Sequence, residues 1–184
     1  MFCVGTELKA VLNERTDWFE SLIEEVRTVY SGSLVYAANW DEYQHIHFWD
    51  KLDYIGINAY FPFGKRESDY SWEPAKKEMQ KASKKWDAPV LFTEYGYLSV
   101  PDCFTATWEL ENQIHDLTID EECQKQALEK LWKAMGHEEW WAGGFLWKWF
   151  PEGMGHEGYV EKDYTPQGKK AEESLSQIFK EINR

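Results

Sequence analysis

Basic residues are scarce in this sequence relative to acidic ones. Its 184 residues include 20 Lys and Arg against 33 Asp and Glu, which gives a formal net charge of −13. Because nucleic-acid binding needs a concentrated basic surface, we expect no nucleic-acid partner. An acidic surface mainly favours solubility, and it is compatible with a neutral substrate.

Cysteines and long apolar runs are also scarce. Cys3, Cys103 and Cys123 form no CxxC motif and no disulfide-dense pattern, so we expect ordinary free thiols. No apolar run reaches the length of a membrane span, and we expect no membrane partner. The start, MFCVGTELKA, lacks the basic residues and the long apolar region of a signal peptide. The location of the protein stays open, since an upstream segment would permit secretion or export to the periplasm.

Linkers, cofactor motifs and metal-ligand clusters are missing as well. No stretch rich in Pro, Gly and Ser divides the chain, which predicts a single domain over residues 1–184. The GMGHEG stretch lacks the strand and helix of a dinucleotide-binding fingerprint, and we expect no cofactor. His45 and His47 resemble a metal-binding pair, but no acid or third histidine accompanies them, so we expect a surface turn and no metal. His156 is expected to be a solvated loop residue near the cleft.

Aromatic residues, in contrast, are abundant, at 17% of the chain with 11 Trp. Most of these rings are expected to fill the core. Rings at strand ends are the exception, because there they can line a cleft that grips flat apolar ligand faces.

Short apolar runs alternate with helical patterns along the chain. The expected strands lie within Phe2–Thr6, Ser33–Asp41, Leu52–Pro62, Ala88–Tyr97 and Trp141–Pro151. The expected helices are Arg15–Tyr30, Pro74–Trp86, Ile119–Glu138 and Gln167–Ile182. This alternation predicts an α/β fold with a parallel sheet, and the runs are apolar throughout, which predicts burial on both faces. An open doubly wound sheet and part of a (β/α)₈ barrel both fit.

Polar and aromatic residues gather where these strands end. In both architectures, active groups lie beyond the carboxyl ends of the strands. The residues at these ends, which we expect to face a ligand, are Thr6, Glu7, Asn39, Trp40, Asp41, Asn58, Tyr60, Glu94, Tyr95, Trp147 and Trp149. A full ring of acid, amide and aromatic side chains is hard to explain by packing alone.

Glu7 and Glu94 are the two glutamates that directly follow an apolar strand. A barrel brings non-adjacent strand ends to one mouth, and a retaining glycosidase needs two carboxyl groups about 5–5.5 Å apart. One attacks the anomeric carbon, and the other acts as acid and then base. Tyr60 is placed to donate a hydrogen bond to the nucleophile, and Trp40 and Trp147 to stack on a sugar ring. The alternative is that each acid caps a helix or pairs with a lysine.

Five stretches, FCVGTEL, YAANWDEY, LDYIGINAYFP, LFTEYGY and GGFLWKWFP, occur in an order that resembles glycoside hydrolase family 113. That family belongs to the clan of retaining (β/α)₈ glycosidases, and its described members are mainly endo-acting β-1,4-mannanases. The resemblance implies that Glu7 is the acid/base at the end of barrel strand four and Glu94 the nucleophile at the end of strand seven. It also implies that Trp147 forms the floor of the cleft and that Tyr60 lies near the nucleophile.

The sequence departs from the family pattern in two respects. Much of the clan has Asn before the acid/base, contacting the sugar 2-hydroxyl, where this chain has Thr6. If Phe2–Thr6 is strand four, strands one to three are absent, and barrels of this type need about 250 residues. The expected fold is therefore a partial barrel of strands four to eight, with exposed edges that favour self-association. Two functional alternatives remain, a non-catalytic carbohydrate-binding fragment and a related retaining enzyme acting on glucan or chitosan.

Overall fold

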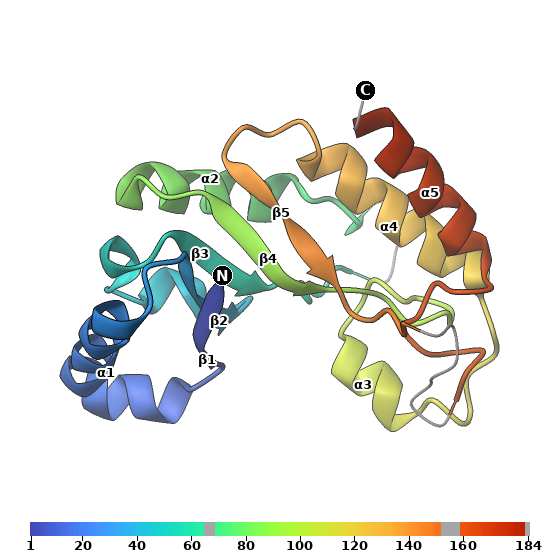
Figure 1. Ribbon diagram of the computed structural model, residues 1–184. Helices are drawn as coiled ribbons and strands as arrows, with labels where there is room; N and C mark the ends of the chain where they lie inside the picture. Colours follow the sequence, from blue (N-terminus) through green and yellow to red (C-terminus); the bar gives the residue numbers. More distant parts are fainter. Residues whose placement is uncertain (65–68, 152–158, 183–184) are drawn as a thin grey trace. The chain divides into compact units, whose positions relative to one another are not determined.

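The computed structural model describes residues 1–64, 69–151 and 159–182, and it contains one five-stranded sheet with the strands in chain order (Figure 1). The strands are β1 (Phe2–Thr6), β2 (Leu34–Asn39), β3 (Tyr54–Asn58), β4 (Val90–Tyr95) and β5 (Trp141–Leu146). The helices are α1 (Lys9–Val29), α2 (Glu73–Trp86), α3 (Thr107–Asn112), α4 (Glu121–Met135) and α5 (Lys170–Ile182). Two short 3₁₀ turns, η1 (Tyr43–His45) and η2 (Trp49–Lys51), follow β2.

The five predicted strands and four predicted helices are confirmed. Helix α1 begins at Lys9, six residues earlier than expected, and it contains one non-helical residue, Arg15, where its axis kinks. The short helix α3 was not expected. The expected short turn after β2 is η1, which ends at His45.

Strands β1 and β2 run parallel, with Phe2 opposite Leu34, and β2 and β3 run parallel in an unbroken register that ends with Asn39 opposite Asn58. The pairing of β1 with β2 changes register between Cys3 and Thr6, as at a β-bulge. Parallel pairing brings the carboxyl ends of neighbouring strands to one edge of the sheet. The polar strand-end residues of β2 and β3 therefore lie side by side.

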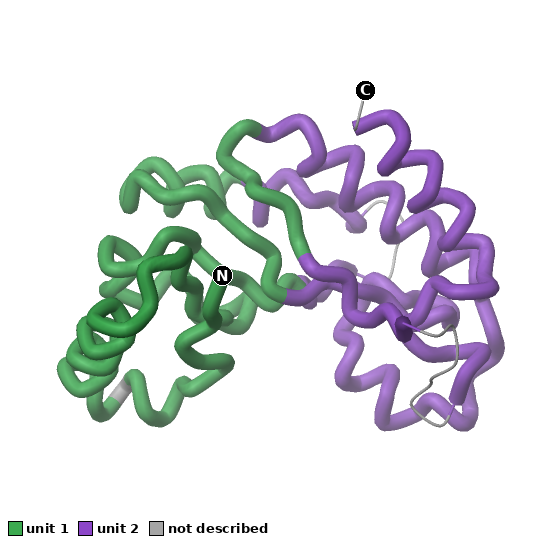
Figure 2. Tube along the Cα trace, viewed as in Figure 1, with its two compact units in different colours: residues 1–59, 77–93, 139–144 green, residues 60–76, 94–138, 145–184 purple. Residues whose placement is uncertain are grey.

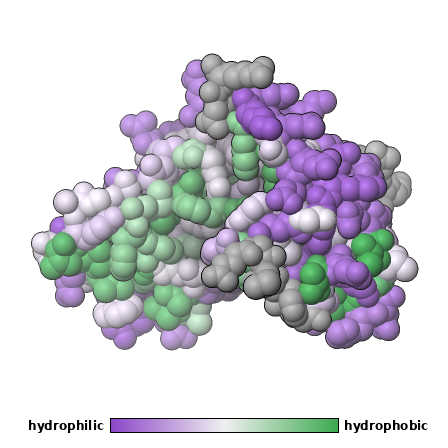
Figure 3. Space-filling view, turned by 45° about the vertical axis from the view of Figure 1, so that its right-hand side comes forward, coloured by the Kyte–Doolittle hydropathy of each residue, from purple (hydrophilic) through white to green (hydrophobic). Residues whose placement is uncertain are grey.

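The expectation that every strand is buried on both faces is wrong for β1 and β5. Strands β2 and β3 are almost wholly buried, but Phe2 on β1 is 48% exposed and Phe145 on β5 is 58% exposed. These two strands are the first and last of the sheet order, so among the described residues each has one neighbouring strand. Hydrophobic residues gather visibly on part of the surface in Figure 3.

The chain divides into two compact units (Figure 2), and β4 and β5 each contribute to both. Unit 1 comprises residues 1–59, 77–93 and 139–144. Its core includes three aromatic rings, Phe19 of α1, Tyr36 of β2 and Phe48, with ring centroids 5.1–5.8 Å apart. All three are at most 1% exposed, so they pin α1 against the sheet.

Unit 2 comprises residues 60–76, 94–138 and 145–184, and α4 packs on α5 within it. Helix α4 begins after Asp120, whose carboxylate accepts a hydrogen bond from the Cys123 amide, as an N-cap residue does. The buried faces of the two helices carry apolar residues such as Leu131 and Leu175. Within the described ranges, no helix combines the length and the apolar character needed to cross a bilayer.

Candidate active site

Glu7 lies directly after β1 in unit 1, and its backbone is held in an uncommon conformation. Its φ of 51° falls in the left-handed region, which costs a non-glycine residue roughly 1 kcal/mol. Two hydrogen bonds fix this turn to β2. The Glu7 amide donates to the Ala37 carbonyl at 2.9 Å, and the Leu8 amide donates to the Tyr36 hydroxyl at 2.7 Å. Strained backbone held by its surroundings is typical of functional sites.

The Glu7 carboxylate is oriented by a short chain of hydrogen bonds from β3 and β4. The Asn58 amide nitrogen donates to Glu7 Oε1 at 2.9 Å. The Thr93 hydroxyl in turn donates to Asn58 Oδ1 at 2.7 Å, which fixes the direction of the amide. Asn58 is only 1% exposed, so it acts on Glu7 and not on a bound ligand. Thr93 was not expected from the sequence, which carries no signal for such a supporting role.

Glu94 lies near the end of β4 in unit 2, where a tyrosine donates to it. The Tyr60 hydroxyl donates to Glu94 Oε2 at 3.0 Å, as the sequence predicts. Burial raises the pKa of Tyr60 far above its usual value, and the nearby Glu94 charge raises it further. The phenol therefore stays protonated as a donor. The Tyr164 ring meets the Tyr60 ring edge-on, with centroids 6.1 Å apart. No motif in the sequence marks Tyr164 as a neighbour of Tyr60.

The ends of β4 and β5 are held close together beside Glu94. The Trp147 amide donates to the Tyr95 carbonyl at 2.7 Å, and the peptide bond after Trp147 is cis. Gly96 makes the approach possible, because a Cβ at this position would lie 2.0 Å from the Trp147 carbonyl oxygen. The glycine thus allows the Trp147 backbone to lie against the end of β4, the strand that carries Glu94.

Two tryptophans after β5 are partly exposed. Trp147 is 37% exposed and Trp149 is 49% exposed, and the Lys148 ammonium lies 4.3 Å from the Trp147 ring centre. Aromatic faces of this kind suit the apolar face of a sugar. Tyr95, in contrast, is 1% exposed, and its ring packs edge-on against Trp132 of α4. Its burial argues against the expected contact of Tyr95 with a ligand.

The remaining strand-end residues lie in unit 1. Thr6 is exposed, and its hydroxyl lies 3.8 Å from the Cys3 sulfur. Asn39 Oδ1 accepts a hydrogen bond from the Trp40 amide at 2.8 Å, which shapes the turn after β2. Asp41 is exposed, and its carboxylate lies 3.9 Å from the Lys9 ammonium.

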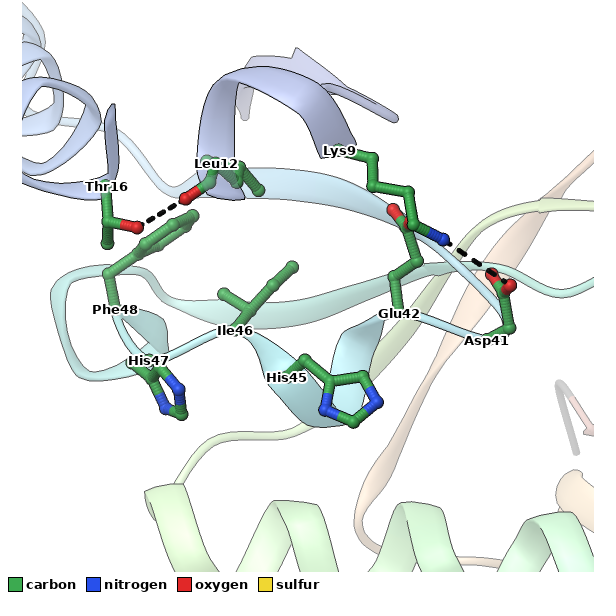
Figure 4. Close-up of a pocket in the computed structure, with 9 residues that line it drawn as sticks. All are labelled: Lys9, Leu12, Thr16, Asp41, Glu42, His45, Ile46, His47 and Phe48. Carbon is green, nitrogen blue, oxygen red and sulfur yellow. Dashed lines mark hydrogen bonds and ion pairs between the residues drawn. The ribbon is translucent and has the colours of Figure 1, made fainter. Parts of the chain in front are cut away.

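A pocket of about 300 Å³ lies between the start of α1 and the turn after β2 (Figure 4). Lys9 forms a 2.6 Å ion pair with Glu42 at one end. His45 and His47 line the pocket, and Figure 4 shows both imidazoles on the side away from Lys9. In the part of the chain that the structure describes, no group of three or more His, Cys, Asp or Glu side chains gathers as a metal site requires. His156 lies outside the described residues.

Comparisons with known proteins agree with this arrangement of strands and helices. The family model described as Glycoside Hydrolase Family 113 matches residues 1–169. The β-mannanase AaManA of Alicyclobacillus acidocaldarius, solved in complex with ManMIm, is 27% identical, with a TM-score of 0.81. The match covers 99% of this chain and 55% of that one. A further GH113 β-1,4-mannanase is 25% identical, with a TM-score of 0.79 and coverage of 98% and 55%.

A more distant structure shares the fold alone. The β-glucuronidase of Faecalibacterium prausnitzii is 18% identical, with a TM-score of 0.58 over 92% of this chain and 29% of that one. A comparison with curated proteins finds no relative. The chain spans about half the length of the mannanases that it matches, which agrees with the expected partial (β/α)₈ barrel. On the family-model match, this chain belongs to glycoside hydrolase family 113.

Proposed function

We propose that this chain carries the two catalytic glutamates of a retaining glycoside hydrolase that acts on β-1,4-mannan. Glu94 is the nucleophile, and Glu7 is the acid and then the base. The observation that carries the proposal is that each glutamate lies at or near the carboxyl end of a strand in a family 113 chain and accepts a hydrogen bond from a buried or half-buried neutral donor. The similarity to β-1,4-mannanases supports the choice of substrate.

Glu94 attacks the anomeric carbon and forms a covalent glycosyl-enzyme. The Tyr60 hydroxyl holds the carboxylate by Oε2 and stabilises negative charge on that oxygen. Because Tyr60 remains protonated, this donor persists across the working pH range. Loss of the hydroxyl is expected to lower the rate of the attack without removing it, by about 10–100-fold for one hydrogen bond to a charged group.

Glu7 protonates the leaving oxygen and later accepts a proton from water. The Asn58 amide occupies Oε1, so the transferred proton resides on Oε2. Thr93 prevents the amide from turning over, because its hydroxyl donates to Asn58 Oδ1. The left-handed turn at Glu7 sets the direction in which the side chain leaves the backbone.

Hydrolysis of mannan by the purified chain tests the proposal, with reducing ends as the readout. Glu94→Gln is expected to abolish turnover. Glu109→Gln is a matched control, because Glu109 is an exposed residue in the first turn of α3. Turnover that survives in Glu94→Gln defeats the assignment of the nucleophile. A panel of mannan, glucan and chitosan decides the sugar, and a preference for either of the last two overturns the mannan substrate.

The two roles are separated by the leaving group of the substrate. A 2,4-dinitrophenyl β-mannoside needs no proton for departure, so its first cleavage step tolerates loss of the acid. Glu7→Gln is therefore expected to release a burst of dinitrophenol while losing activity on mannan. Glu94→Gln is expected to lose both. The reverse pattern would exchange the two roles.

A non-catalytic carbohydrate-binding fragment is the second candidate. One observation favours it: the aromatic residues Trp147 and Trp149 after β5 are partly exposed. Titration calorimetry with manno-oligosaccharides distinguishes the candidates, because binding without product supports the fragment. Neither binding nor product from the folded chain contradicts both.

We propose further that residues 1–184 form one domain that associates through the outer edge of β1. Strands β4 and β5 each run through both compact units, which supports a single domain. An edge strand with an exposed Phe2 favours pairing with another strand. Sedimentation is expected to show concentration-dependent association that Phe2→Lys weakens and that Val29→Lys, 86% exposed at the end of α1, leaves unchanged. A monomer at all concentrations contradicts the association.

A further inference from the structure

Two cysteines far apart in the sequence meet in unit 2. Cys103 lies in the loop after β4, and Cys123 lies in the first turn of α4, 20 positions later. Both are free thiols, and the Cys123 thiol donates a hydrogen bond to the Cys103 sulfur at 2.8 Å, compared with 2.03–2.05 Å for a disulfide bond. The backbone already joins the two segments, because the Asp120 amide donates to the Ser99 carbonyl at 2.8 Å. Only a small movement separates the two thiols from a bond.

The two sulfurs differ in accessibility. Cys103 is fully buried, whereas Cys123 is half-buried and lines a pocket of about 290 Å³. The Cys103 amide donates to the Cys123 sulfur at 3.3 Å, and the capping bond to Asp120 holds the Cys123 backbone. Hydrogen bonding with the thiol and the amide of Cys103 lowers the pKa of Cys123 despite its burial, and burial raises the pKa of Cys103. Cys123 is therefore the thiol that a reagent reaches first and the better nucleophile of the two.

We propose that Cys103 and Cys123 form a redox-sensitive dithiol site that a small disulfide closes into an intramolecular bridge. The Cys123 thiolate attacks one sulfur of the reagent, the reagent's S–S bond breaks, and one thiolate leaves and takes a proton. Cys103 then gives up its proton to solvent and attacks the Cys123 sulfur. The second half of the reagent leaves as a thiol. Two protein thiols and one disulfide thus become one protein disulfide and two small thiols.

The pocket also selects the charge of the reagent. Asp102, Asp120 and Glu122 line it together with one cation, Lys130, and the whole chain has a formal net charge of −13. A cationic disulfide is attracted to this pocket and an anionic one is repelled, and both effects are stronger at low salt. Cystamine is therefore expected to react several-fold faster than oxidised glutathione, and the difference is expected to shrink at high salt.

The test is oxidation of a Cys3→Ser protein, which retains only the two cysteines of the site. After cystamine treatment and alkylation, the intact mass is expected to be lower by two hydrogen atoms, with no adduct and no alkylated thiol. A peptide map without reductant is expected to join the segments that contain Cys103 and Cys123. The thermal midpoint is expected to rise by about 6–12 °C and to return with dithiothreitol. Two adducts, or two thiols that still alkylate, overturn the proposal.

The order of the two steps is tested by single replacements in the same background. Cys103→Ser is expected to hold one stable cysteamine adduct on Cys123. Cys123→Ser is expected to react slowly, because Cys103 is buried. Should either variant fold poorly, the alkylation rates of the two thiols in the Cys3→Ser protein give the same information, and faster labelling of Cys103 contradicts the order. Oxidation in denaturant is the control, in which adducts replace the bridge.

Discussion

Replacing Lys169 by Met is expected to destabilise unit 2 strongly, because the ammonium is fully satisfied where it lies. Its three N–H groups meet three acceptors: Asp163 Oδ1 at 2.8 Å, the Asp163 carbonyl at 3.0 Å and the Ser99 hydroxyl at 2.7 Å. The side chain of Lys169 is 6% exposed, and that of Asp163 is 0% exposed. Methionine fills similar volume but leaves the carboxylate buried without its counter-charge.

Removal of one partner from a buried ion pair costs about 3–5 kcal/mol. The lower end applies here, because Asp163 Oδ1 keeps a hydrogen bond from the Thr165 amide at 3.1 Å. Ser99 also keeps one, since its hydroxyl donates to the Asp163 carbonyl at 3.0 Å. A loss of about 3 kcal/mol corresponds to about a 150-fold change in the folding equilibrium and a thermal midpoint lower by about 6–12 °C.

Urea unfolding at pH 7, followed by far-ultraviolet circular dichroism, measures the loss as a shift of the midpoint. Lys170→Met is the matched control, because this neighbouring side chain is 59% exposed and its ion pair with Glu122 spans 3.4 Å. An exposed pair of this kind contributes less than about 1 kcal/mol. The double variant Asp163→Asn/Lys169→Met is expected to be more stable than Lys169→Met alone, since no charge is left buried. Equal losses in Lys169→Met and Lys170→Met would refute the reasoning.

Three further predictions concern the surroundings of the two glutamates. Tyr36→Phe removes the hydroxyl that accepts from the Leu8 amide and is expected to lower the unfolding free energy by about 1 kcal/mol in denaturant titrations. Burial raises the pKa of Tyr36 to about 12, so the unfolded chain loses this proton before the folded chain does as pH rises from 10 to 12. The unfolding free energy is therefore expected to fall in this pH range, and to fall less in Tyr36→Phe. Gly96→Ala places a Cβ 2.0 Å from the Trp147 carbonyl oxygen, and a loss of about 1–3 kcal/mol is expected in thermal melts; an unchanged midpoint would contradict the close approach.

The positions of the strands could be predicted because apolar runs and helical patterns alternate clearly. Their exposure could not, since the runs look alike whether a strand has one neighbour or two. Phe2 and Phe145 are apolar residues of the two outer strands, and both are exposed. The start of α1 was missed because Arg15 interrupts the helical geometry, and a kink of this kind has no Pro or Gly to mark it.

The candidate site could be predicted in part. The hydrogen bond between Tyr60 and Glu94 matches the expectation, because Tyr60 follows β3 and Glu94 lies near the end of the neighbouring strand β4. Tyr95 was misjudged although the rule is simple: successive residues of a strand point to opposite faces, so Glu94 and Tyr95 do not share a side. The meeting of Cys103 and Cys123 could not be predicted, since it depends on how the loop after β4 returns to α4.

The backbone conformation of Glu7 disfavours glutamate, whereas the chemistry proposed for this position requires a carboxylate. Glycine or asparagine would adopt this backbone at lower cost, and neither carries a carboxylate. A search for heat-tolerant variants that ignored hydrolysis would therefore drift toward those residues and discard the proposed proton donor. Under selection for hydrolysis, in contrast, the carboxylate is retained in spite of the backbone conformation that disfavours it.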